Sequence, residues 1–110
     1  MGYKDAVWKL FDGDDVVGTL TVTGSDFPWL NATFDPTEAF DKWRPLFEHE
    51  LRLLETIDEN VDEWEDTYRR IATGLTLHNS AGEPVAEFLL HVENGHARWR
   101  WSDEPFDLDE

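Results

Sequence analysis

The sequence predicts an α+β fold, in which an antiparallel sheet of five or six strands carries two helices packed on one face, in the order βββ-αα-βββ. Three observations predict it. Both ends of the chain hold β-rich segments separated by turn residues, the middle shows a three- and four-residue apolar period, and "ENGH" joins two alternating segments. We expect a single domain over residues 1–102, followed by an acidic tail over residues 103–110 that frays.

The first three strands are predicted at residues 3–11, 16–23 and 29–34. The turn "DGDD" between the first two indicates a hairpin, but two-residue and four-residue loops both fit, so its register stays ambiguous. The same four residues are rich in oxygen atoms. A calcium loop would also need a bidentate acid at a fixed later position, and the following residues do not supply one.

A first helix is predicted from "DPTE", with Asp35 as the N-cap and Pro36 at the first helical position. Pro45 removes the backbone hydrogen bond to the carbonyl of Asp41, so it either kinks this helix or separates two helices. The apolar stripe continues through Pro45 and therefore favours a kink. It consists of Phe40, Trp43, Phe47, Leu51 and Leu54.

A second helix is predicted to begin near Asn60, because Asn60 and Glu63 have the spacing of an N-cap and its reciprocal acid. Gly74 is expected to end this helix in a left-handed conformation. The stripe expected to be buried consists of Val61, Trp64, Tyr68 and Ile71.

The last three strands are predicted at residues 75–79, 85–92 and 96–102. A type I′ turn at Asn94-Gly95 makes Glu93 face His96, so the numbers of paired residues sum to 189. One face of this hairpin is then apolar, with Phe88, Leu90, Val92, Ala97, Trp99 and Trp101. The other face is mostly polar, with Leu89, His91, Glu93, His96, Arg98 and Arg100.

Charge is the extreme property of the chain, with 25 acids, 9 bases and a net charge of −16. Such a surface repels phosphates and anionic lipid, so we expect no nucleic-acid partner and no membrane partner. The segment from Glu48 to Asp66 holds nine acids and one arginine, a net −8 at the corner between the two helices. We predict that this corner binds a basic protein surface. Its residues, called here the acidic corner, are Glu55, Asp58, Glu59, Asp62 and Glu63.

The competing explanation is that these acids only solvate a helix. Glu65 and Asp66 lie four residues before Arg69 and Arg70, an arrangement worth about 0.2–0.5 kcal/mol per pair. Acids in the first turn of a helix also complement its dipole. Neither effect accounts for Asp58 and Glu59, which precede the expected cap.

The sequence offers two further candidate binding sites. The polar sheet face at His91, His96, Arg98 and Arg100 could recognise an anionic group, although pairing with acids across the hairpin is the simpler explanation. Phe27 and Trp29 flank Pro28 in a loop. They could serve as an aromatic anchor for a partner or close one end of the core.

Known chemical motifs are missing from the sequence. There is no cysteine, no HExxH, no GxSxG and no phosphate-binding glycine loop, so we predict no catalytic residue, no metal and no cofactor. The N-terminal segment has no apolar run of signal-peptide length, and a cytoplasmic location is expected.

Three functions therefore remain open. The first is a small acidic protein-binding module of the inhibitor, immunity or adaptor type. The second is a small-ligand binder or enzyme that uses the polar sheet face. The third is a salt-adapted housekeeping domain whose charge only confers solubility. The oligomeric state, monomer or homodimer, is also open because an edge strand could pair with a second copy.

Overall fold

The computed structural model describes residues 5–26 and 28–102 and confirms the α+β fold in the order βββ-αα-βββ. Six antiparallel strands form one sheet in the spatial order β4-β1-β2-β3-β6-β5. The strands are β1 (Val7–Asp12), β2 (Asp15–Asp26), β3 (Trp29–Pro36), β4 (Thr76–His78), β5 (Glu87–Glu93) and β6 (His96–Ser102). The expected fraying tail at 103–110 lies outside the described residues.

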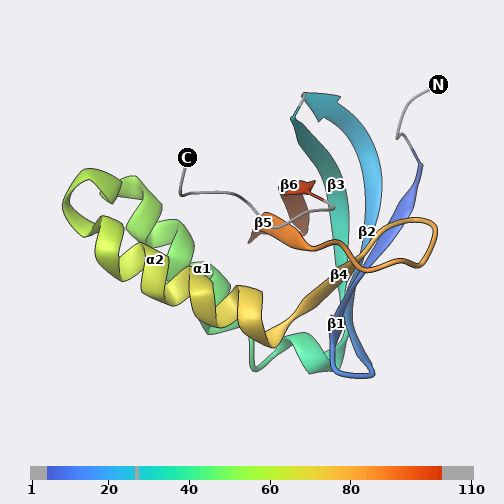
Figure 1. The fold of residues 1–110 in the computed structure, drawn as a ribbon, viewed down its shortest axis with the longest axis horizontal. Helices are drawn as coiled ribbons and strands as arrows, with labels where there is room; N and C mark the ends of the chain where they lie inside the picture. The colour runs from blue at the N-terminus through green and yellow to red at the C-terminus, as the bar shows by residue number, and fades with distance from the viewer. Residues whose placement is uncertain (1–4, 27, 103–110) are drawn as a thin grey trace.

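The helical part consists of a short 3-10 helix, η1 (Glu38–Phe40), and two helices, α1 (Arg44–Glu55) and α2 (Ile57–Gly74). Figure 1 shows α1 and α2 side by side, extending away from the sheet as a hairpin. No helix in the described part of the chain is long and apolar enough to cross a membrane.

Both predicted hairpins form. In β5–β6 the pairing runs from Glu93 opposite His96 to Phe88 opposite Trp101, which confirms the predicted register. Asn94 and Gly95 both have positive φ, 51° and 79°, as a type I′ turn requires. In β1–β2, Asp12 pairs with Asp15, so the ambiguous first loop has two residues. A bulge interrupts the pairing of the same hairpin between Leu10 and Phe11, just before the loop.

The start of the first helix was predicted wrongly. Asp35 and Pro36 belong to β3, where Pro36 pairs with Gly18 of β2. Thr37 is the cap instead, and its hydroxyl accepts the backbone N–H of Ala39 at 3.1 Å. The reason is that the pairing of β3 with β2 continues to Pro36, two residues beyond the predicted end of the strand at residue 34. The contact with β2 continues at Thr37, whose N donates to Val17 O at 2.9 Å.

Pro45 does not kink a helix, contrary to the favoured prediction. It lies in the first turn of α1, directly after Arg44, where a backbone N–H would have no helical acceptor. The apolar stripe therefore crosses a boundary between η1 and α1, two separate elements.

The second helix also departs from its predicted signals. The helix spans Ile57–Gly74, but it contains a kink at Asn60, whose φ of −130° and ψ of 25° are not helical, so a helical segment does begin near Asn60. The Asn60 side chain does not cap it, because its amide donates to Thr56 instead. Gly74 stays helical, and a Cβ there would collide with the Trp43 ring, so close approach explains this glycine. Val61, expected to be buried, is 46 % exposed.

The core is one cluster of buried side chains contributed by the sheet and by the helical segment. Trp8 packs edge-on against Trp99 and Trp101, with ring centroids 5.3 and 5.0 Å apart. From the helical side, Phe40, Phe47 and Ile71 close the same cluster of buried residues. Segment 84–86 connects the edge strand β4 with β6, because Val85 N donates to Leu77 O of β4 and Ala86 N donates to Ser102 O of β6.

Gly18 in β2 provides a test of this packing. A Cβ at Gly18 would overlap the ring of Phe34, so we expect Gly18→Ala to lower the free energy of unfolding by about 1–3 kcal/mol. Gly24→Ala, in the same strand, meets no atom within 4 Å and is expected to be neutral or slightly stabilising. Urea denaturation of the two variants checks this, and equal effects would contradict it.

Candidate functional site

A buried carboxylate lies at the junction between the helices and the sheet. Glu50 of α1 is completely buried, with 0 % exposure. One carboxylate oxygen, Oε2, accepts the indole N–H of Trp64 in α2 at 2.7 Å, and the other, Oε1, lies 2.6 Å from Nδ1 of His91 in β5. Burying a carboxylate is costly unless its oxygens are paired. Both are paired here, so Glu50 joins α1, α2 and β5 through one side chain.

His91 is held from a second side by Trp29 of β3. The two rings stack with centroids 5.7 Å apart and an interplanar angle of 24°, and only 8 % of His91 is exposed. The guanidinium carbon of Arg98 lies 4.8 Å from the centroid of the Trp29 ring. Trp29 thus covers residues of the polar sheet face. The other half of the expected aromatic anchor, Phe27, lies outside the described residues.

Tyr68 of α2 fastens the helical hairpin to the same strand. Its hydroxyl donates to Phe88 O at 2.9 Å and accepts Leu90 N at 2.7 Å. Strand β5 is at the edge of the sheet, so Tyr68 satisfies backbone groups that no neighbouring strand reaches. Burial raises the pKa of Tyr68 well above its usual range, and the negative charge of Glu50 adds to this.

A groove opens on the outer face of strands β2, β3, β6 and β5. Its volume is about 580 Å³, and its lining includes His91, His96 and Arg98 of the alternative ligand site, together with Asn31 and Thr23. Arg100 is exposed on the same strand but does not line this groove. The structure therefore brings three of the four expected residues together around one hollow.

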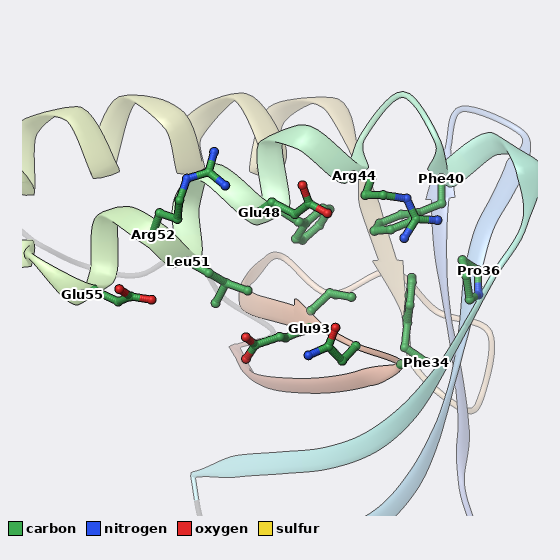
Figure 2. Close-up of a pocket in the computed structure, with 13 residues that line it drawn as sticks. Phe34, Pro36, Phe40, Arg44, Glu48, Leu51, Arg52, Glu55 and Glu93 are labelled. Atoms are coloured by element: carbon green, nitrogen blue, oxygen red, sulfur yellow. The ribbon is translucent and has the colours of Figure 1, made fainter.

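A second hollow, a cleft of about 320 Å³, lies between α1 and the β5–β6 turn. Figure 2 shows Phe34, Phe40 and Arg44 at one end of this cleft, and Glu48 and Glu55 of α1 on the side opposite Glu93. Arg44 stacks over the Phe40 ring at 5.0 Å. The charged residues that line the cleft are Arg44, Glu48, Arg52, Glu55 and Glu93.

The acidic corner lies where α1 turns into α2, and all five of its carboxylates are exposed. Within residues 5–26 and 28–102, only Glu63 of these five lies within hydrogen-bonding distance of a basic side chain, with its Oε2 3.2 Å from Nε2 of His49. Asp66, outside the corner, pairs with Arg70 at 3.3 Å as expected. Arg69 also pairs with Asp66, at 3.6 Å, and not with Glu65.

The "DGDD" turn is engaged with the helical side of the molecule. Asp12 Oδ2 lies 2.8 Å from Lys42 Nζ and accepts the indole N–H of Trp43 at 3.1 Å. The hydrogen bond from Lys42, followed by that from Trp43, lowers the pKa of Asp12. Across the described ranges, no group of three or more His, Asp or Glu side chains is arranged to hold a metal ion.

Comparisons of the chain with known protein families, with curated proteins and with solved structures find no match. Function must therefore be argued from the sites themselves.

The sequence analysis did not predict that Glu50 is buried or that it bonds to Trp64. The signal was present, because Glu50 lies three residues after Phe47 and four before Leu54, on the apolar stripe of α1. An acid on a stripe of this kind indicates a buried carboxylate that needs a partner.

Removal of the Glu50 carboxylate should destabilise the whole fold. Glu50→Ala leaves the buried Nδ1 of His91 and the indole of Trp64 without their acceptor, so we expect a loss of about 3–5 kcal/mol in unfolding free energy. Glu48→Ala, an exposed acid on the same helix, should change it by less than about 0.5 kcal/mol. Chemical denaturation measures both, and a small effect of Glu50→Ala would refute the role of the carboxylate.

Tyr68 should make stability fall at alkaline pH. Its folded-state pKa is raised, so the unfolded chain releases the proton first. Its contribution is complete below about pH 10 and declines as pH rises from there toward the folded-state pKa, by up to about 1.4 kcal/mol per pH unit. Urea unfolding of the wild type and Tyr68→Phe between pH 9 and 11 isolates this term, and parallel curves would contradict it.

Proposed function

We propose that this chain is a small acidic protein-binding module, of the inhibitor, immunity or adaptor type, which presents the acidic corner to a basic partner surface. One observation carries the proposal. The helical hairpin extends from the sheet, and at its turn Glu55, Asp58, Glu59 and Asp62 are exposed and form no ion pair with any described residue. Clustered charge of one sign repels itself, and a basic partner would relieve that repulsion.

Val61 adds an apolar contact to this surface. It is 46 % exposed and is followed directly by Asp62 of the corner. An exposed apolar side chain beside carboxylates is the composition expected of a small contact centre with a polar rim. The corner therefore combines long-range attraction with a side chain that can be buried on binding.

The cleft beside α1 extends the same surface, because Glu55 belongs to the corner and also lines the cleft. Phe34, Phe40 and Phe47 contribute apolar lining, while Glu48 and Glu93 contribute carboxylates (Figure 2). A lysine or arginine from a partner could lay its apolar stem on the aromatic rings and its charge beside a carboxylate. Such a residue would be an anchor of the interface.

The proposal predicts an association that is fast and sensitive to salt. Partners captured from the native host's lysate at low salt, and again at about 0.5 M salt where the Debye length is only a few ångströms, provide the binding pair. The decisive variant is Asp58→Lys/Glu59→Lys/Asp62→Lys. We expect it to slow association at low salt by at least about tenfold.

A charge-matched variant separates a local surface from a general charge effect. Asp14→Lys/Asp35→Lys/Glu83→Lys makes the same change in net charge at exposed positions on the sheet side of the molecule. We expect it to slow association by less than about threefold. Equal effects of the two variants, or no specific partner at either salt concentration, would refute the acidic corner as a binding surface and leave the salt-adapted explanation.

A further inference from the structure

The groove on the outer sheet face contains a cation, Arg98, that forms no ion pair with an acid among residues 5–26 and 28–102. Arg98 is exposed, in a protein that has 25 acids and 9 bases. Its cross-strand neighbours are Asn31 and His91. Neither neighbour is an acid, so an ion pair across the hairpin does not explain why an arginine occupies this position.

Arg98 is instead held against an aromatic ring. Its guanidinium carbon lies over the Trp29 ring, 4.8 Å from the ring centroid, which is within the range of a cation–π contact. The N–H groups lie in the plane of the guanidinium and remain available at its edge. A guanidinium restrained in this way is prepared for a planar, two-point contact with a carboxylate or phosphate.

His91 supplies a second group to the groove. When Glu50 is a carboxylate its oxygens can only accept hydrogen bonds, and the 2.6 Å contact is then a donation from Nδ1–H of His91. Nε2 is then the ring nitrogen left for a ligand, and it becomes a donor in the imidazolium form. Glu50 and the stacked Trp29 ring fix the orientation of the imidazole from two sides.

We propose that this groove binds the oxyanion group of a small molecule, a carboxylate or a phosphate, between Arg98 and Nε2 of His91. Asn31 and His96, which also line the groove, supply further polar groups at its sides. Glu93 lines the groove as well, and the net charge of −16 disfavours a polyanion, so the site suits one isolated anionic group. The site is independent of the acidic corner.

The test is a titration of the ¹⁵N-labelled protein with inorganic phosphate and, separately, with acetate, at ionic strength held constant with chloride. We expect saturable NMR shifts at Asn31, His91 and Arg98 with at least one of the two anions. The anion that binds more tightly identifies the preferred group. Absence of saturable shifts with both would overturn the proposal.

Two arginine variants test whether binding is local. Arg98→Gln should weaken anion binding by at least about tenfold, because it removes a charge-assisted contact. Arg100→Gln removes the same charge two residues away, from a side chain that does not line the groove, and should weaken binding by less than about twofold. Equal weakening would show a non-specific charge effect and overturn the site.

A conservative variant distinguishes geometry from charge alone. Arg98→Lys keeps the charge but loses the planar fork, so we expect weakening between that of Arg100→Gln and that of Arg98→Gln. Arg98 is exposed, and the amide spectrum of each variant shows directly that its fold is retained. Full binding by Arg98→Gln in a folded protein would refute the role of the guanidinium.

Discussion

The buried carboxylate of Glu50 is the interaction on which the placement of the helical hairpin depends. It receives Trp64 from α2 and His91 from β5, so a single ionised side chain relates three elements that are distant in sequence. A fully buried charge tolerates few alternative arrangements, because any displacement of α1 would leave the carboxylate or its donors without partners. We infer that Glu50 contributes to specificity, since it favours this arrangement of the hairpin over other apolar packings of the same helices.

The hairpin is also fixed by the edge strand. Tyr68 bonds to Phe88 O and Leu90 N of β5, and its ring stacks on Trp64 with an interplanar angle of 13°. The two anchoring points, Glu50 and Tyr68, therefore share Trp64. At the other end of the sheet, segment 84–86 bonds to β4. Phe88 O and Leu90 N at one edge and Leu77 O at the other are thus satisfied within the chain, which reduces the tendency of these parts of the edges to pair with other strands.

The acidic side chains fall into two groups, those that are hydrogen-bonded within the protein and those that are exposed. Glu50 and Asp12 are engaged with donors of the protein, whereas the exposed carboxylates of the acidic corner mostly are not. The groove with Arg98 differs from this surface, because its lining holds one arginine, two histidines and a single acid, Glu93. Leu51 of α1 and the turn residues Glu93 and Asn94 line both the cleft and the groove, so they separate the two hollows. The buried pair of Glu50 and His91 connects the helical hairpin to the groove, because His91 belongs to both.

The sequence by itself determined the strand and helix order, the β5–β6 register and the position of the acidic corner. These follow from local rules, such as the positive φ that Asn94-Gly95 accepts and the alternation of apolar residues on either side of it. Helix boundaries were less predictable, because the pairing of Pro36 with Gly18 extended β3 past the signal at Asp35. Only the tertiary structure decided that His91 is buried against Glu50, that the Trp29 ring stacks on it, and that Arg98 lies against Trp29 and pairs with no acid among the described residues. These contacts join residues up to 69 positions apart, from Trp29 to Arg98, and no local pattern encodes which distant side chain a polar group will meet.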